Sequence, residues 1–163
     1  MFTEMSRKTA CNRSADGVES EYVQVGKAMK GKNMQATYDF LKRAGTYFLA
    51  TCDAAQPRVR PFGTVNLFNG RLYIQTGKAK AVSRQLHSNP KLELCATLDG
   101  RWIRVEATAV EDDSRAARVS MLEAYPALQS LYSPDDGNTE VWYLRKVTAT
   151  IYSFTEPPET HRF

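Results

Sequence analysis

The stretch Gln56–Lys80 constrains the fold more than any other part of the sequence. Within it, Asn69-Gly70 separates two runs in which apolar and polar residues alternate with the two-residue period of a half-buried strand. Asparagine and glycine both tolerate positive φ, which a two-residue hairpin turn demands. We therefore predict an antiparallel hairpin that brings Arg58 and Arg60 back towards the segment Thr76–Lys80.

Pro61 lies inside the first strand of this predicted hairpin. A proline has no N–H to donate to a neighbouring strand, so it is found at sheet edges and bulges. We expect the strand to be bulged at Pro61 or to form an edge of the sheet.

The rest of the chain supplies more strands of the hairpin type, with helices between them. Asp99-Gly100 is a second hairpin dipeptide, and the last strand-like run is expected to break near Lys146. Strand-like runs cover residues 46–52, 92–98, 102–110 and 140–154, and helical patterns cover 35–44, 81–88 and about 112–125. Because no alternating βαβ pattern occurs, we predict a mainly β (α+β) fold, a six-stranded antiparallel barrel with peripheral helices.

Residues 1–33 show no sustained apolar periodicity and are rich in Lys, Arg, Ser, Gly and Asn. Such a composition is typical of a mobile segment. We predict a flexible N-terminal extension over 1–33 and one domain over 34–163, with Met34 as an alternative start of the natural chain.

Composition and charge exclude several classes of function. The chain has 163 residues and a net charge of +4, but its basic residues form no long run, so nucleic acid is not an expected partner. Two histidines are too few for a histidine-rich metal site, and we expect no metal. Three cysteines without a CxxC spacing indicate reduced thiols. No stretch approaches the ~18 apolar residues of a membrane span, and we expect a cytoplasmic protein.

No known catalytic motif is present. A GxSxG elbow is missing, the acidic pairs fit helix caps and turns, and His87 fits an exposed helix position better than a base. We therefore name no catalytic residue.

The segment Thr76–Lys80 is the best candidate for ligand binding. It is not a P-loop, yet it offers a hydroxyl, free N–H groups at a glycine turn, Lys78 and Lys80, and a following helix N-terminus. Together these groups stabilise a phosphate, although a solvated basic loop would explain the same pattern equally well. Aromatic residues on or beside the strands (Phe62, Tyr73, Trp102 and Trp142) would suit a planar phosphorylated cofactor, while each one alone is more typical of a core.

Several short motifs in a fixed order resemble the pyridoxamine 5′-phosphate oxidase-like split β-barrel family, and within it the small Nim-type (nitroimidazole-resistance) flavoproteins. The likeness covers about residues 34–163. The motifs are Phe48-Leu49-Ala50-Thr51, Gln56-Pro57-Arg58-Val59-Arg60-Pro61-Phe62-Gly63, Gly70-Arg71-Leu72-Tyr73, Lys80-Ala81-Val82, Asn89-Pro90, Met121-Leu122-Glu123-Ala124-Tyr125-Pro126 and Tyr132-Ser133-Pro134-Asp135-Asp136-Gly137-Asn138.

The resemblance implies a homodimer that binds FMN in a groove between two subunits. It places Arg60 and Lys80 at the phosphate, with Thr76 and Lys78 in the same pocket, and gives Arg58 either the phosphate or the dimer contact. It also places the backbone of Pro61, Phe62 and Gly63 at the isoalloxazine edge and brings Trp102 from the partner subunit. Many relatives carry Ser-Arg-Lys or Lys-Lys-Pro where this chain has Lys78-Ala79-Lys80-Ala81, so one phosphate cation is displaced or lost.

The resemblance further implies an FMN-dependent oxidoreductase that reduces small-molecule acceptors, with NAD(P)H as a candidate donor. True pyridoxamine 5′-phosphate oxidase activity is not expected, because the C-terminal segment that holds pyridoxal phosphate has no counterpart. Two further functions stay open: a non-catalytic flavin- or haem-binding or stress protein on the same fold, and a deazaflavin-dependent reductase.

Overall fold

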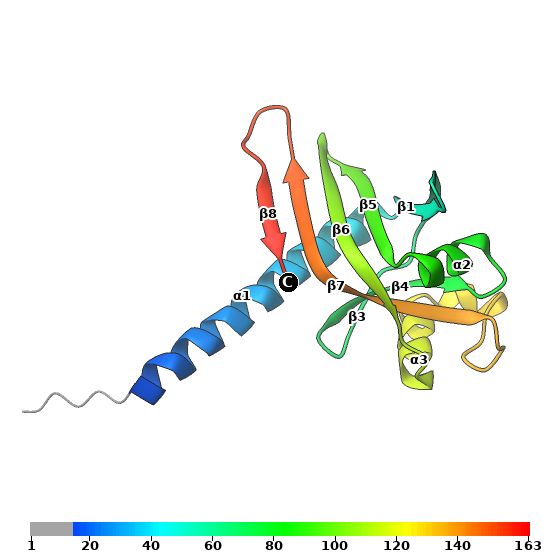
Figure 1. The fold of residues 1–163 in the computed structure, drawn as a ribbon, viewed down its shortest axis with the longest axis horizontal. Coiled ribbons are helices and arrows are strands. Elements are labelled where there is room, and N and C mark those ends of the chain that lie inside the picture. Colours follow the sequence, from blue (N-terminus) through cyan, green and yellow to red (C-terminus); the bar gives the residue numbers. More distant parts are fainter. Residues whose placement is uncertain (1–14) are drawn as a thin grey trace, which may run out of the picture.

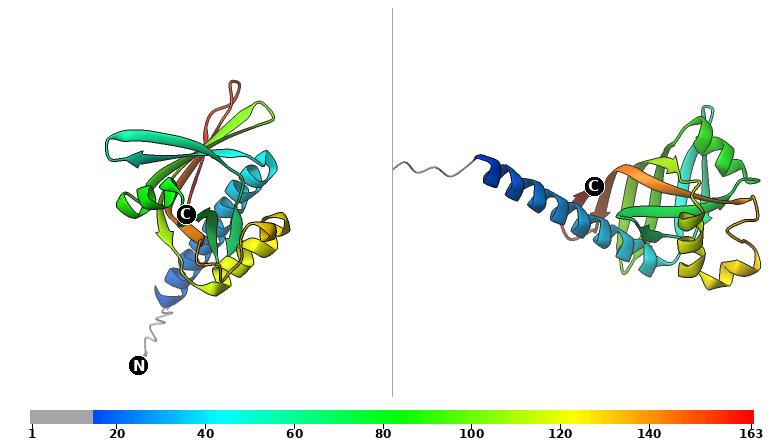
Figure 2. Two further views of the ribbon diagram at one scale, coloured as in Figure 1. Left: turned by 90° about the vertical axis from the view of Figure 1, so that its right-hand side faces the viewer. Right: turned by 90° about the horizontal axis from the view of Figure 1, so that it is seen from below.

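The computed structural model describes residues 15–163, and its first element is a long helix, α1 (Ala15–Ala44). The helix projects well beyond the sheet in two views (Figures 1 and 2). Residues 1–14 lie outside the described part. The sequence predicted a helix only from Gln35, after a flexible extension over residues 1–33, whereas the helix already begins at Ala15. The reason is physical: apolar periodicity reports packing against a core, and the exposed positions Val23, Val25 and Met29 pack against little.

Eight strands form a single sheet in which every pairing is antiparallel. They are β1 (Tyr47–Asp53), β2 (Gln56–Phe62), β3 (Asn66–Phe68), β4 (Arg71–Gly77), β5 (Lys91–Leu98), β6 (Arg101–Glu111), β7 (Thr139–Tyr152) and β8 (Glu159–Arg162). Their order is β2-β1-β5-β6-β7-β4-β3, with β8 beside β7 (Figure 1). The sheet curls without joining its two end strands, so the predicted split antiparallel barrel is confirmed, with eight strands in place of six.

The predicted hairpin around Asn69-Gly70 is only partly correct. The turn itself is confirmed, because both residues have positive φ (47° and 69°) and join β3 to β4. However, β2 ends at Phe62, and it pairs with β1 instead of running alongside β4. Arg58 and Arg60 therefore lie on another strand pair, and they do not face Thr76–Lys80 across a hairpin. As expected from Pro61, β2 is an edge strand.

The second hairpin and the break in the last strand are both confirmed. Asp99-Gly100, again with positive φ at both residues, joins β5 to β6. In β7, Lys146 has φ 52°, and two residues of β7 stand opposite one residue of β6 at this point. This is a β-bulge, and it lets one long strand bend across the barrel.

Three further helical segments cover the sheet. The helix α2 (Ala81–Ser88) packs against β1 and β4, and α3 (Arg115–Ala124) packs against β3 and β7 beside the short 3₁₀ segment η1 (Pro126–Ser130). Ser114 caps α3 by accepting a hydrogen bond from the Ala117 N–H at 3.3 Å. The core inside the barrel is aliphatic and aromatic, with Tyr47, Leu49, Leu94, Ile103, Val105 and Ala149 fully buried. No helix among the described residues has the length and apolar character needed to cross a membrane.

Candidate functional site

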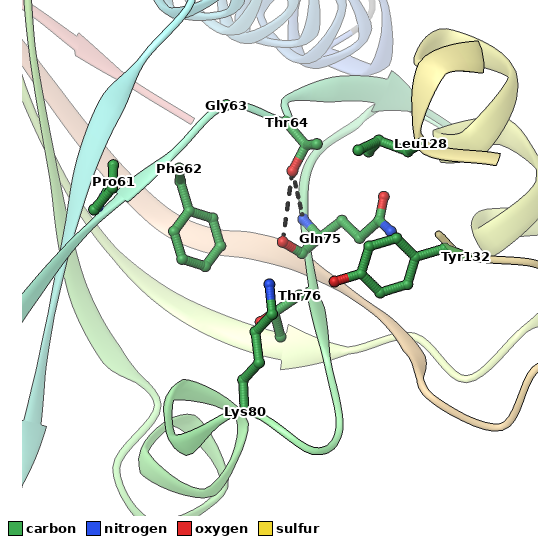
Figure 3. A pocket seen from close by; sticks show the side chains of 9 residues that line it. All are labelled: Pro61, Phe62, Gly63, Thr64, Gln75, Thr76, Lys80, Leu128 and Tyr132. Carbon is green, nitrogen blue, oxygen red and sulfur yellow. Dashed lines mark hydrogen bonds between the residues drawn. The ribbon is translucent and has the colours of Figure 1, made fainter. Parts of the chain in front are cut away.

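A small pocket lies where the β2–β3 linker, the end of β4 and the start of α2 meet. Its volume is about 160 Å³, and side chains from these elements and from the end of β2 point into it, together with Leu128 of η1 and Tyr132 just after η1 (Figure 3). The lining residues are Pro61, Phe62, Gly63, Thr64, Gln75, Thr76, Lys80, Leu128 and Tyr132. The structure thus brings together five of the residues expected at the cofactor: Pro61, Phe62, Gly63, Thr76 and Lys80.

Hydrogen bonds from two tyrosines fix the linker that forms one wall of this pocket. The Tyr47 hydroxyl donates to the Thr64 carbonyl at 2.6 Å, and burial followed by the neighbouring Tyr125 raises the pKa of Tyr47 well above its ordinary value. The Tyr125 hydroxyl bonds both backbone groups of Val65: it accepts from the N–H at 2.9 Å and donates to the carbonyl at 3.0 Å. The linker is therefore held open at a defined shape instead of continuing as a strand.

Thr64 connects this wall to β4. Its hydroxyl accepts a hydrogen bond from the Gln75 N–H at 3.2 Å and lies 3.5 Å from the Gln75 carbonyl (Figure 3). These contacts satisfy the backbone of Gln75 and leave its side chain turned to the pocket.

Three buried polar atoms at the pocket have no hydrogen-bond partner among the described residues. They are both side-chain atoms of Gln75, Oε1 and Nε2, and the hydroxyl oxygen of Thr76, and the two residues are only 6% and 3% exposed. A buried polar group without a partner costs about 1–3 kcal/mol, so such groups are rare in folded proteins. All three atoms lie at one pocket, where a bound polar group would complete their hydrogen bonds.

Lys80 gives the pocket its positive charge. It is the N-cap residue of α2 and makes no side-chain capping bond, so the first N–H groups of the helix have no cap. Its Nζ lies 5.9 Å from the centre of the Tyr132 ring, and no carboxylate among the described side chains pairs with it. An unpaired ammonium beside an uncapped helix N-terminus suits a phosphate.

Arg60 lies beside this pocket, on the face of the sheet covered by α2. Its guanidinium donates to the Leu49 carbonyl, to Thr51 Oγ1 and to Gln85 Oε1, at 3.2, 2.7 and 2.6 Å. Burial, and then the nearby Arg58, lower the pKa of Arg60, although an arginine stays protonated. All three acceptors are uncharged, so the positive charge of Arg60 is not neutralised by any described side chain.

Three other residues expected at the cofactor lie away from this pocket. Arg58 approaches Asp53 at 3.5 Å, and the Lys78 ammonium lies 3.7 Å from both Glu111 and Asp113. Trp102 is near the β5–β6 turn, stacked on Tyr152 with 5.4 Å between ring centres. None of the three lines the pocket of its own chain.

Sequence reasoning missed four of the lining residues: Thr64, Gln75, Leu128 and Tyr132. Alternation along the sequence assigned Gln75 an outward position on a half-buried strand, whereas the structure buries the whole strand from Leu72 to Gly77. Leu128 and Tyr132 come from a segment far along the chain, and no local pattern places them here.

The sequence model of the pyridoxamine 5′-phosphate oxidase family matches residues 34–150. The chain belongs to this family. A NimC/NimA family protein from Clostridium acetobutylicum is 38% identical and superimposes with a TM-score of 0.81, over 84% of this chain and 96% of that one. The resemblance found in the sequence motifs is thereby confirmed. No curated protein sequence matches the chain.

More distant members of the pyridoxamine 5′-phosphate oxidase fold bind different cofactors. An FMN-binding protein related to pyridoxamine 5′-phosphate oxidase, from Nostoc punctiforme, is 17% identical (TM-score 0.55, 78% of this chain and 94% of that chain). A haem-binding protein from Mycobacterium smegmatis is 16% identical (TM-score 0.60, 83% of this chain and 57% of that chain). At these identities the likeness establishes the fold alone.

Proposed function

We propose that this protein is a homodimeric FMN-binding oxidoreductase that reduces small-molecule acceptors, with NAD(P)H as electron donor. The observation that carries the proposal is the pocket at the β2–β3 linker. It combines three unpartnered buried polar atoms with the unpaired ammonium of Lys80, in a chain that shares its fold with an FMN-binding protein.

Each part of FMN has a matching group in the chain. Lys80, the uncapped N-terminus of α2 and the unpaired charge of Arg60 suit the phosphate. The side chain of Gln75 and the Thr76 hydroxyl suit the hydrogen-bonding edge of the isoalloxazine ring and the ribityl hydroxyls. These parts of FMN both donate and accept hydrogen bonds, and so do the two side chains. Phe62 offers an apolar wall beside them (Figure 3).

The size of the pocket supports a second subunit. Its volume of about 160 Å³ in one chain is well below the roughly 300–1,000 Å³ of typical ligand sites. A partner chain that closes the open side would complete the site, and Trp102, which does not reach the pocket of its own chain, is the residue we assign to that contact.

Bound FMN supplies the redox chemistry, because flavins accept and release hydride and electrons. The contribution of the chain is binding, orientation and charge. Of the described residues that line the pocket, only Lys80 and Tyr132 have titratable side chains, and we assign neither of them the role of acid or base.

Purified protein should be yellow, and its flavin absorbance should follow the protein through gel filtration. Colourless protein that takes up no added FMN would refute the proposal. Light scattering then checks the dimer.

Catalysis is tested separately, by NAD(P)H oxidation with quinone or nitro acceptors. Absence of turnover in the yellow protein would favour a non-catalytic flavin protein. A haem spectrum would indicate a haem-binding protein, and tryptophan quenching by a deazaflavin but not by FMN would indicate a deazaflavin-dependent reductase.

A further inference from the structure

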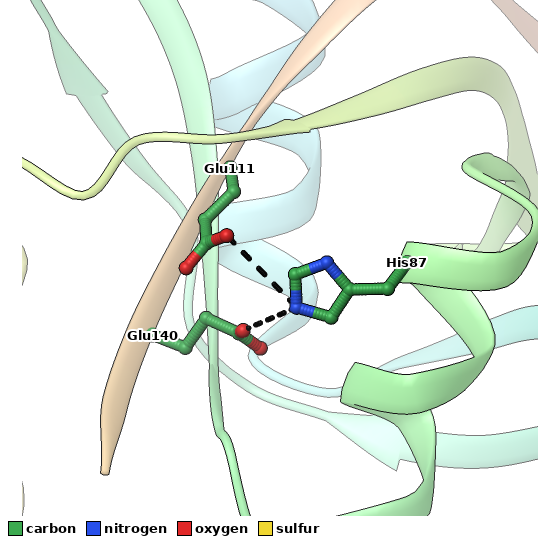
Figure 4. A group of neighbouring side chains, drawn as sticks. All are labelled: His87, Glu111 and Glu140. Atoms are coloured by element: carbon green, nitrogen blue, oxygen red, sulfur yellow. Dashed lines mark hydrogen bonds and ion pairs between the residues drawn. The ribbon is translucent and has the colours of Figure 1, made fainter. Parts of the chain in front are cut away.

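Three potential metal ligands converge near the C-terminal end of α2. His87 comes from α2, Glu111 from the end of β6 and Glu140 from the start of β7 (Figure 4). The His87 Nε2 atom lies 3.1 Å from Glu140 Oε1 and 3.9 Å from Glu111 Oε2. Ligand atoms of all three residues lie within 4.8 Å of one another. The sequence predicted an exposed histidine on a helix; the structure confirms this exposure and also places the imidazole beside two carboxylates.

Glu140 is the unusual member of this group. It is 1% exposed, and its Oε1 accepts a hydrogen bond from the Ser83 hydroxyl at 3.2 Å, while its Oε2 has no partner among the described residues. A buried carboxylate retains its charge at low cost only when paired or bound to a metal. One half-exposed imidazole and one hydroxyl do not satisfy all of its acceptor positions, so a further cation would stabilise it.

The imidazole of His87 is held in place by Trp142. The two rings meet edge to face with 4.9 Å between centres. The His87 side chain is also 51% exposed, so solvent reaches the imidazole. Trp142 therefore orientates the His87 ring on its buried side, while the other side of the ring is accessible to solvent.

We propose that His87, Glu111 and Glu140 bind a divalent transition-metal ion, Zn²⁺ above all. Imidazole and carboxylate are ordinary zinc ligands with bonds of about 2.0–2.2 Å, which place neighbouring ligand atoms about 3.3 Å apart in a tetrahedron. To reach this spacing, the 3.1 Å separation must lengthen slightly and the 3.9 Å separation must shorten by about 0.6 Å. All three ligand atoms already lie within 4.8 Å of one another. Three protein ligands leave the fourth position to water, on the exposed side, and a proton on Nε2 would be released on binding.

Lys78 gives the proposal a distinctive signature. Its ammonium lies 3.7 Å from Glu111 Oε1, so it already supplies part of the positive charge that a metal ion would supply. The ion must share Glu111 with this lysine. Removing the ammonium by K78A should therefore tighten zinc binding, whereas a site elsewhere would not respond.

The test is calorimetric titration of Zn²⁺ into chelator-treated, full-length protein. We expect one ion per chain in the wild type. Removal of a residue that only orientates a ligand commonly costs 10- to 100-fold in affinity, so H87A and E111Q, which remove ligands, should each lose at least about 100-fold. Circular dichroism checks that the variants are folded. If H87A does not fold, E111Q still tests the proposal, because Glu111 is partly exposed.

The matched control is E159Q, because His161 and Glu159 form another histidine–carboxylate contact, at 2.8 Å, without a third ligand among the described residues. It should bind zinc like the wild type. As a second readout, Co²⁺ should quench Trp142 fluorescence in a W102F background and should fail to do so when H87A is added. Absence of binding in the wild type, or binding that survives both H87A and E111Q, would overturn the proposal.

Discussion

Two groups of polar side chains, at opposite ends of α2, differ in the sign of their charge. At the N-terminal end, Lys80 and the nearby Arg60 have no carboxylate partner among the described residues, and the unpartnered atoms of Gln75 and Thr76 are neutral. At the C-terminal end, two glutamates surround His87, and the unpartnered atom is a carboxylate oxygen.

The two groups are direct neighbours across the sheet. Thr76 of the pocket stands opposite Glu140 of the cluster in the β4–β7 pair. Both contain an unsatisfied buried polar atom, and the surrounding charge differs: it suits an anion at one end of α2 and a cation at the other. The comparison therefore makes predictions that can fail independently.

The largest effect should be on FMN binding, and it should differ between Lys80 and Lys78, which are only two positions apart. K80A should raise the dissociation constant of FMN about 10- to 100-fold, because a charge-assisted hydrogen bond contributes about 1.5–3 kcal/mol. K78A should change it little, since the Lys78 ammonium faces Glu111 and Asp113. Flavin fluorescence titration measures both. If K78A weakens FMN binding as much as K80A does, the division between the two regions is wrong.

Removing the Tyr125 hydroxyl, the clamp that holds the backbone of Val65 in the pocket wall, should give the next largest effect. Y125F loses hydrogen bonds to both backbone groups of Val65 and leaves a partly buried N–H unsatisfied. The free energy of unfolding should fall by about 1–2 kcal/mol in urea titrations. Y132F is the control, because no hydrogen bond of the Tyr132 hydroxyl occurs within the described part of the chain, and it should leave stability nearly unchanged. Equal losses in both variants would contradict the clamp.

Gln75 should show opposite effects on stability and on binding. Q75L removes two unpartnered polar atoms, so the flavin-free protein should gain about 1 kcal/mol of unfolding free energy. The same substitution should weaken FMN binding, because the ligand loses its partners. Thermal unfolding with and without FMN tests both effects at once. A loss of stability in both states would show that Gln75 is an ordinary structural residue.

A further small effect should come from Asp136, in the loop between η1 and β7. Its carboxylate accepts hydrogen bonds from Ser133, Asn138 and Thr139, while the neighbouring Asn138 accepts from the N–H groups of Lys78 and Ala79. Burial acts to raise the pKa of Asp136, but these hydrogen bonds outweigh it and hold the pKa below its ordinary value.

D136N should therefore cost about 1 kcal/mol at neutral pH, by analogy with helix caps. Because the folded pKa is lowered, this contribution is present above the unfolded pKa of about 3.9 and is lost as the pH falls further. The stability difference between wild type and D136N should shrink below about pH 4. D135N, which removes an exposed ion pair with Arg115, should have a smaller effect. A difference that does not change with pH would contradict this assignment.

Local sequence signals predicted most of the fold because turns and strand alternation are local properties. Asn69-Gly70, Asp99-Gly100 and the break near Lys146 all have the expected backbone geometry. The error at Phe62 had a long-range cause. The Gly63–Val65 linker is fixed by Tyr47 and Tyr125, and no pattern within the hairpin itself reports those contacts.

The candidate site was predictable only in part for the same reason. Lys80 and Thr76 belong to one continuous turn segment and could be recognised from their chemistry. The histidine cluster joins residues from three elements, and its buried glutamate resembles any polar residue at a strand start. Only the fold brings His87 to it.

The projecting helix α1 also affects how the protein moves through solution. Thirty helical residues extend about 45 Å, and much of this length lies outside the barrel (Figure 1). An elongated particle diffuses more slowly than a sphere of equal mass, so gel filtration would overestimate the mass of a monomer. A monomer with this shape could elute as an apparent dimer. For this chain, the number of subunits must be taken from light scattering or sedimentation equilibrium, which do not depend on shape.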